Sequence, residues 1–266
     1  MGSMSSNEPR KRLKAAESRR ALLNAGLELL KSRGVAPGLD RVTLKDAIEL
    51  SGVPRSTAYR LYEGGRGQLE EYRADLLSDL DSSVDTGPTG MAIEQVLADV
   101  APLIESHDPS KLASALREVI RVLAHTNVES VAQSLEWRVY MSSLASVGTG
   151  VEADAAMTEA FRLAAQQFGD RFVELFAELG SIFGLRPRDP LTLHDLGALV
   201  SSTIEGTALH QPVEPRLADM KRTTGVDGQL QSWSAAGIAI EGLVVSWFEP
   251  DPHANVSADL GSWIAW

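Results

Sequence analysis

The sequence predicts an all-α protein in which a small N-terminal helical domain precedes a larger C-terminal helical bundle. Almost every stretch with a regular apolar pattern has the helical period rather than the alternation of a strand. Strand and hairpin signals are missing apart from Asp227-Gly228, which we assign to the start of a helix. The 266 residues suffice for two structural units, and loops with Pro or Gly separate the long helical patterns.

The first two helices have recognisable ends. One helix is expected from about Arg12 to Arg33, and Gly34 supplies a left-handed stop after it. Thr43, with Asp46 three residues later, resembles a capping box that opens a second helix over Leu44–Ser51. These signals place two helices with a loop between them in the first fifty residues.

Two further helices complete the N-terminal part. Gly52 is expected where the chain turns through a conformation that a Cβ atom would penalise. Pro54 suits the first position of a short third helix that ends near Tyr62. Gly64-Gly65 ends this segment, a fourth helix runs from Arg66 towards Leu80, and the polar stretch 81–90 is a loop or domain boundary.

Six longer helical patterns follow, at roughly 93–105, 110–124, 128–147, 151–183, 193–210 and 228–247. We therefore expect a helix-turn-helix domain at residues 10–65, a helical ligand-binding and dimerisation domain at residues 66–248, and a tail at residues 249–266. In the tail, we expect at least Trp263 to dock on the bundle, because an aromatic ring left in water is unfavourable.

Composition and charge limit the function. With 44% hydrophobic and 23% charged residues the chain is not wholly disordered, and the absence of Cys excludes disulfides, thiolate zinc sites and cysteine nucleophiles. The net charge of −11 is unevenly distributed, since residues 1–60 carry 12 Lys and Arg against 6 Asp and Glu. Beyond residue 77 the count is 11 against 26. A basic N-terminal part on an acidic bundle suggests two separate roles.

The segment Thr43 to Tyr62 carries the clearest functional signal. Two short helices with Gly at the start of the tight turn between them form the helix-turn-helix plan, in which early residues of the second helix point at base edges. Those residues are Arg55, Ser56, Thr57 and Tyr59. An ordinary helical hairpin with solvated side chains is the alternative. The surrounding Lys and Arg residues, Lys45, Arg60 and Arg66 among them, favour DNA binding.

From about Arg19 to Leu77 the sequence resembles the TetR-like bacterial transcriptional regulators. The resemblance rests on the Thr-Leu-Lys-Asp start at Thr43, Ser-Gly-Val at Ser51 and Ser-Thr-Ala-Tyr-Arg-Leu-Tyr at Ser56. It implies major-groove contacts by Arg55, Ser56 and Thr57. It also implies that four residues contact phosphates, namely Thr43, Tyr59, Tyr62 and Arg66.

One departure from the family pattern concerns packing. The family commonly has a small residue at position 48 and a larger aliphatic one at position 58, whereas this chain has Ile48 and Ala58. Because volume-conserving exchanges are tolerated in cores, we expect Ile48 to pack directly over Ala58 and hold the two helices near their usual angle.

The resemblance also implies an inducer pocket in the C-terminal bundle, and a homodimer. We expect the homodimer to form through the helices around 151–184, 193–210 and 228–247. Two rows of small residues would let helices of two copies approach closely. These rows are Ala198, Ser202 and Gly206, and Ala235, Ala239, Gly242 and Ser246. Tight packing within one subunit is the alternative. A two-fold dimer suits a near-palindromic operator, whose half-sites lie roughly 34–36 Å apart.

The helix expected at 128–147 is apolar on two sides, and one of them is the candidate pocket wall. The candidate wall consists of Trp137, Tyr140, Met141 and Leu144. Arg138, and Glu205 on a later helix, could supply polar contacts, and for these two the alternative is core filling or a solvated or paired charge. The acidic charge of the bundle disfavours a polyanionic effector and leaves neutral or cationic apolar compounds.

No catalytic motif is present: neither G-x-S-x-G, nor H-E-x-x-H, nor a P-loop, and no metal or cofactor is expected. No apolar run is long enough to span a membrane and no secretory signal is visible, so a cytoplasmic protein is expected. The sequence therefore predicts a dimeric DNA-binding regulator, a repressor, whose operator affinity responds to a small effector. The alternatives are control by a protein partner, or an all-helical adaptor or enzyme that does not bind DNA.

Overall fold

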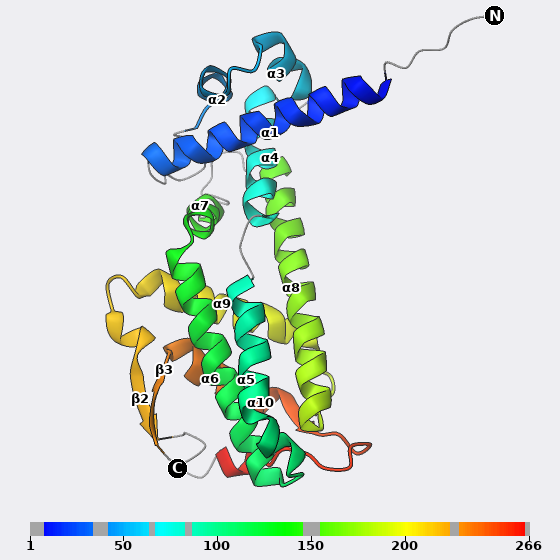
Figure 1. Ribbon diagram of the computed structural model, residues 1–266, viewed down its shortest axis with the longest axis vertical. Helices are drawn as coiled ribbons and strands as arrows, with labels where there is room; N and C mark the ends of the chain where they lie inside the picture. The colour runs from blue at the N-terminus through cyan, green and yellow to red at the C-terminus, as the bar shows by residue number, and fades with distance from the viewer. Residues whose placement is uncertain are drawn as a thin grey trace, which may run out of the picture. The chain divides into compact units, whose positions relative to one another are not determined.

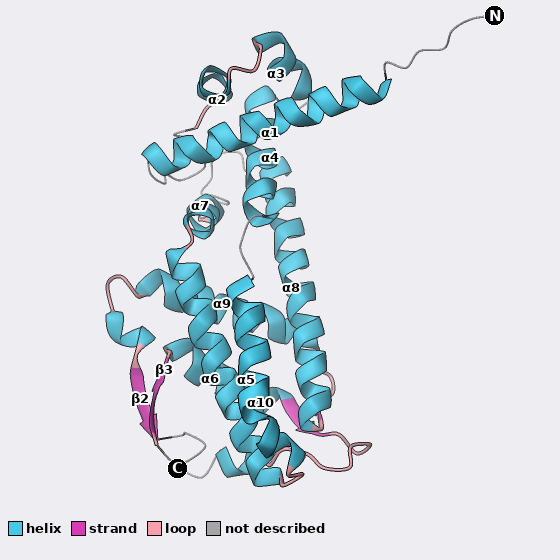
Figure 2. Ribbon diagram, in the orientation of Figure 1, coloured by secondary structure: helices cyan, strands magenta, loops and turns pink. Residues whose placement is uncertain are grey.

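The computed structural model describes residues 8–33, 42–63, 67–82, 87–145, 155–223 and 229–263, and over this part the protein is all-α. Figure 2 shows that helices dominate, and the described residues include two short pairs of strands. The helices divide between two compact units. Residues up to 84 form the first unit together with residues 134–165, and the rest of the chain forms the second.

In the first unit, α2 (Leu44–Ser51) and α3 (Arg55–Leu61) both pack against the long α1 (Glu8–Arg33), as Figure 1 shows. α4 (Gln68–Ser82) packs against α1 as well. The predicted bounds of α2 are confirmed, and α3 begins one residue after Pro54. The core that joins these helices includes buried side chains of α1, α2 and α4: Leu22, Leu30, Ala47, Tyr72 and Leu76.

The helix expected at 128–147 is two helices. α6 (Pro109–Gln133) runs through the break expected near residue 125, and α7 (Leu135–Leu144) begins after Ser134. The Ser134 Oγ accepts a hydrogen bond from the backbone N–H of Trp137 at 3.0 Å, which caps the start of α7. The apolar pattern continues across this break, so periodicity alone does not show it.

α7 belongs to the first unit, which therefore contains more than the residues 10–65 expected to bind DNA. Val139 is fully buried in the same core as α1 and α4, and Leu135, Tyr140 and Leu144 pack on its edge. One apolar face of α7 thus completes the core of the N-terminal helices.

The second unit is built around α6. α5 (Gly87–Glu105), α9 (Leu193–His210) and α10 (Ala235–Trp247) all pack against it, and the described part of α8 (Ala155–Phe183) spans residues of both units. Thr192 caps α9 by accepting from the backbone N–H of Asp195 at 3.1 Å, as its sequence predicts. Two strands, β1 (Leu185–Pro187) and β4 (Phe248–Pro250), pair antiparallel.

The expectation that a helix starts near Gly228 is wrong. β2 (Met220–Thr223), which follows the 3₁₀ turn η2 (Pro215–Ala218), pairs antiparallel with β3 (Leu230–Trp233). Asp227-Gly228 lies outside the described residues, in the connection between the two strands. α10 begins only at Ala235, where the Ser234 Oγ accepts from the backbone N–H of Gly237 at 3.0 Å. Two antiparallel strands thus flank a segment where the apolar run that follows predicts a helix.

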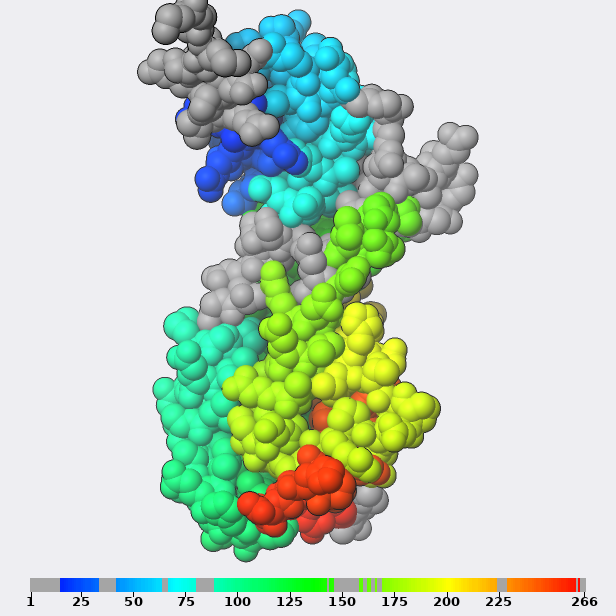
Figure 3. Space-filling view, turned by 90° about the vertical axis from the view of Figure 1, so that its right-hand side faces the viewer, coloured from blue at the N-terminus to red at the C-terminus, as the bar shows by residue number. Residues whose placement is uncertain are grey.

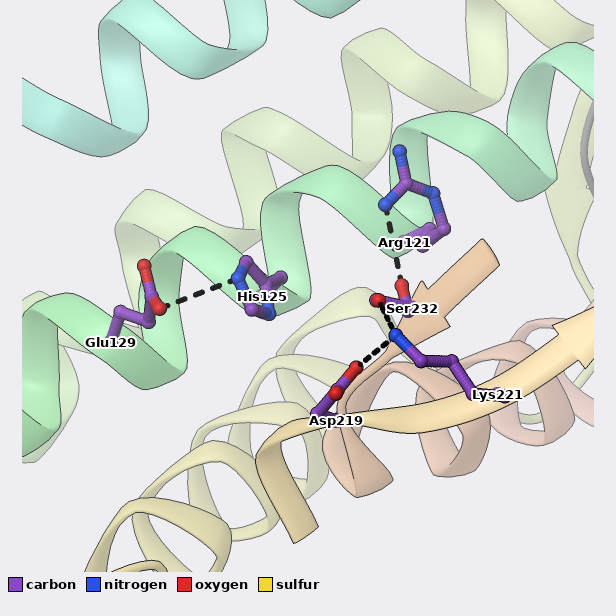
Figure 4. Close-up of polar contacts among 6 residues, drawn as sticks. All are labelled: Arg121, His125, Glu129, Asp219, Lys221 and Ser232. Atoms are coloured by element: carbon purple, nitrogen blue, oxygen red, sulfur yellow. Dashed lines mark hydrogen bonds and ion pairs between the residues drawn. The ribbon is translucent and has the colours of Figure 1, made fainter. Parts of the chain in front are cut away.

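Figure 4 shows polar contacts within the hairpin and a hydrogen bond that joins it to α6. The Arg121 guanidinium donates to the backbone carbonyl of Ser232 at 3.3 Å, and Lys221 pairs with Asp219 at 2.8 Å and also donates to the Ser232 hydroxyl. On α6 itself, His125 lies 3.4 Å from Glu129. The Arg121 hydrogen bond therefore links the hairpin to α6, whereas the Lys221 contacts connect β2 with β3 and with the residue before β2.

The C-terminal segment docks on the second unit (Figure 3, orange to red). The backbone N–H groups of Ala258 and Asp259 donate to the carbonyls of Phe183 and Pro109, at 3.0 Å each. The segment ends in the short 3₁₀ helix η3 (Leu260–Trp263). Trp263 is buried with the Arg117 guanidinium 4.9 Å above its ring, which confirms the expected docking. Arg117 also pairs with the buried Glu241 of α10 at 2.7 Å.

Candidate nucleic-acid interface

The turn between α2 and α3 has the geometry that the sequence predicts. The Thr43 Oγ1 accepts from the backbone N–H of Asp46 at 3.1 Å and so caps the start of α2. Gly52 ends α2 with φ 69°, and its N–H donates to the carbonyl of Ile48 at 3.1 Å. A residue with a Cβ would be strained at this φ, so Gly52 allows the sharp change of direction into α3.

α3 presents a polar outer face. Arg55, Ser56, Tyr59 and Arg60 are all exposed. Thr57 is half-buried, and Ala58 is fully buried beneath it in the core. The exposed set contains two guanidinium groups and two hydroxyl groups, which are donors suited to phosphate oxygens and base edges. Lys45 of α2 is exposed as well and adds a third cation.

Ion pairs hold α2 and α4 to α1. Arg33, at the end of α1, pairs with Asp46 in the first turn of α2 at 2.6 Å. This hydrogen bond lowers the pKa of the Asp46 carboxyl. Arg19 binds Asp75 of α4 through both its Nε, at 2.6 Å, and its Nη2. The short α3 is therefore carried by helices that are themselves fixed to one another.

Tyr62 is not part of the exposed face. Only 4% of the residue is accessible, and its hydroxyl donates to the Asp75 Oδ2 at 3.0 Å. Burial, followed by the charge of Asp75, raises the pKa of Tyr62 well above its usual value. Its ring meets Tyr72 edge-on, with centroids 5.4 Å apart. The structure thus corrects the phosphate contact implied for Tyr62 and places this side chain in the core.

The remaining predicted DNA-contact residues have mixed placements. Thr43 is half-buried and its hydroxyl caps α2, and Arg66 lies outside the described residues. Ile48 and Ala58 are both buried in the core of the first unit, while their direct contact stays a prediction. Asp75 is not among the residues predicted from the sequence. Its partners Arg19 and Tyr62 are distant in sequence, so no local pattern indicates that they bind this carboxylate.

The candidate ligand residues are divided between one helix of each unit. Trp137 is buried, Arg138 is exposed, and Tyr140, Met141 and Leu144 are half-buried, all on α7 in the first unit. Glu205 lies on α9 in the second unit, where burial raises the pKa of its carboxyl and the Ser201 hydroxyl donates to it at 3.3 Å. Tyr140 and Leu144 pack against the core of the first unit.

The two rows of small residues lie mostly on the surface. Ala198 and Ser202 of α9 are exposed, as are Ala239, Gly242 and Ser246 of α10, and Gly206 is half-buried. A Cβ atom added at Gly206 or Gly242 would meet no other atom of the described chain within 4 Å. α9 and α10 pack against each other, and Leu199 and Leu209 on α9 are 42% and 54% exposed. Packing among the described residues thus leaves most of these small side chains uncovered, while their role in a dimer stays a prediction.

No family model matches the sequence, and no curated protein matches it. Among solved structures, the fold is similar to native NalD of Pseudomonas aeruginosa, described as the secondary repressor of the MexAB-OprM multidrug efflux pump. That match has 20% sequence identity and a TM-score of 0.42, and it covers 77% of this chain and 88% of that one. A likeness of this degree assigns neither family nor function. None of the helices over the described residues has the length and apolar character needed to cross a membrane.

Proposed function

We propose that the protein is a DNA-binding transcriptional regulator, a repressor that occupies its operator as a homodimer. The observation that supports this best is the exposed outer face of α3, which carries Arg55, Ser56, Tyr59 and Arg60. A rigid turn at Gly52 and a buried core beneath Ala58 support that face. A helix of this kind, with its early polar residues outward, fits the major groove of a duplex.

Charge supports the same function. The N-terminal residues to position 60 are basic in a chain whose net charge is −11, so attraction to phosphates is confined to the end that carries α3. We assign phosphate contacts to Thr43, Lys45, Tyr59, Arg60 and Arg66, and base contacts to Arg55, Ser56 and Thr57. Tyr62 is left out of this set because its hydroxyl is buried on Asp75.

The dimer is proposed through the exposed surface of α9 and α10. Its small residues would allow two copies to approach closely, and Leu199 and Leu209 supply apolar area that a monomer leaves in water. A C₂ contact uses the same patch on both copies, so two α3 helices would be presented to two half-sites. Such an arrangement predicts an operator with two-fold symmetry.

An effector is proposed at the face of α7 that carries Trp137, Arg138 and Met141. The Trp137 indole Nε1 is buried and has no hydrogen-bond partner among the described residues, so a ligand acceptor would satisfy it. A neutral or cationic apolar compound is compatible with the acidic bundle. Because other side chains of α7 are in the core of the first unit, a ligand there would act on the helices that support α3 by preferring one arrangement of them.

The test is selection of bound sequences from a pool of random duplexes by the full chain. A regulator enriches one near-palindrome with half-site centres one helical turn apart, and its affinity falls steeply with salt. An adaptor or enzyme without DNA binding enriches nothing. A basic surface that binds acidic protein retains duplexes without sequence preference.

A further inference from the structure

One carboxylate lies on the surface that we assign to DNA. The Glu49 Oε1, in the last turn of α2, is 3.6 Å from the Arg55 Nη2 at the start of α3. Both side chains are largely exposed, at 57% for Glu49 and 66% for Arg55. The two residues come from different helices of the helix-turn-helix, so the pair spans the turn at Gly52.

Glu49 stands between two cations. Lys45 precedes it by one helical turn on the exposed side of α2, and Arg55 faces it from α3. The other carboxylate of α2 that this surface could use, Asp46, binds Arg33 of α1 instead. Glu49 is thus an acidic group placed beside the side chain that we expect to read a base.

The cost of this placement depends on the partner. An exposed ion pair contributes little in water, so Glu49 has small value for folding. Against a duplex, however, a carboxylate is repelled by the phosphates at every sequence. That repulsion is offset only where a base offers a hydrogen-bond donor, and in the major groove the N4 amino group of cytosine is such a donor. A group that penalises every wrong site is a means of specificity.

We propose that Glu49 is a specificity-determining residue that selects a cytosine next to the guanine read by Arg55. In the complex the Glu49 carboxylate accepts a hydrogen bond from cytosine N4, and it holds the Arg55 guanidinium towards guanine O6 and N7. The inference rests on the proposed DNA-binding function and adds a residue from α2 to the base-reading set.

The test compares sequences selected from random duplexes by the wild-type chain, Glu49→Gln and Glu49→Ala. The wild type should favour cytosine at one position beside the guanine by roughly tenfold or more over other bases. Glu49→Gln should move this preference to adenine, because a glutamine amide matches adenine N6 and N7. Glu49→Ala should lose the preference there and bind random duplexes more tightly than the wild type does.

Glu63→Gln is the matched control, since Glu63 is an exposed glutamate just beyond α3. It removes the same charge and should leave every base preference unchanged. Unaltered preferences in both Glu49 variants would overturn the inference while leaving the proposed function intact. A wild-type chain that selects no sequence at all would refute the proposed function itself. Thermal unfolding of each variant checks that exposed substitutions leave the fold unchanged.

Discussion

The hydroxyl of Tyr62 donates to the Asp75 carboxylate at 3.0 Å, and this bond ties the residue that follows α3 to the middle of α4. Asp75 also receives two hydrogen bonds from Arg19 of α1. Three helices of the first unit therefore meet at one carboxylate whose side chain is only 10% exposed. The Asp75 carboxylate therefore supports α3, the helix that we propose to read bases, and is already occupied by Arg19 and Tyr62.

Replacing Tyr62 separates the supporting role from a phosphate contact. Tyr62→Phe keeps the ring in the core and removes one hydrogen bond to a charged group, which is worth about 1.5–3 kcal/mol. We expect chemical denaturation to show a loss of stability near that size. The affinity of the folded variant for DNA should be close to that of the wild type. A uniform loss of affinity on all duplexes, with stability unchanged, would restore Tyr62 to the phosphate-binding set.

Arg55 and Lys45 should differ in what their loss does to DNA binding. Arg55→Ala removes a side chain assigned to a base, so sequence preference should relax and the cost on the specific site should be about 1–3 kcal/mol. Lys45→Ala removes a phosphate contact, so affinity should fall evenly across sequences and the salt slope should decrease by about 1. Titrations of specific and random duplexes at several salt concentrations measure both effects. Equal losses on the two duplexes for Arg55→Ala would contradict its assigned role.

Gly26 of α1 lies close to side chains of α4. A Cβ at this position would collide with the hydroxyl of Tyr72 and with Leu76. The Tyr72 hydroxyl is itself bound to the carbonyl of Leu22 at 3.0 Å, so it cannot move without losing that bond. Gly26→Ala should therefore cost about 1–3 kcal/mol of stability from overpacking, despite the gain in helix propensity.

Gly90 of α5 provides the control for Gly26. It is exposed, and an added Cβ there meets no described atom within 4 Å. Gly90→Ala should leave stability unchanged or raise it by up to about 1 kcal/mol. Urea denaturation of both variants gives the comparison, and a Gly26→Ala protein as stable as the wild type would show that α1 and α4 are less tightly packed than the structure has them.

Local signals predicted the first unit well because its helix ends are encoded in nearby residues. Thr43 and Gly52 fix both ends of α2 through contacts within four positions in the sequence. The hairpin at β2 and β3 was missed because its strands are short and depend on Arg121 of α6, which lies far away in sequence. Likewise, the sequence does not show that Tyr140 and Leu144 of α7 pack against the core of the first unit, since the same apolar pattern suits residues that line a cavity and residues that pack on another helix.

The proposed dimer surface is tested by adding a charge at Gly242. Because an added Cβ there meets open space, Gly242→Glu should fold with the stability of the monomer unchanged. In the proposed C₂ contact the substitution introduces a carboxylate into the interface on both copies, where it would be desolvated without a partner charge, so the dimer should dissociate. Sedimentation equilibrium measures the mass, with Met91→Glu, a 67% exposed position on α5, as the control. An unchanged dimer in Gly242→Glu would place the interface elsewhere.

Glu205 should make the second unit less stable as pH rises. Burial raises the pKa of its carboxyl above the unfolded value, so the folded chain holds this proton more tightly than the unfolded chain does. The free energy of unfolding rises with pH only where the unfolded chain binds more protons than the folded chain does. Here the folded chain binds more, so the free energy of unfolding falls as pH rises, and the loss is complete above the folded pKa. Glu205→Gln removes the titration, and it should be more stable than the wild type at pH 7 by a margin that shrinks towards pH 4. A constant difference between wild type and Glu205→Gln at all pH values would contradict the role assigned to burial.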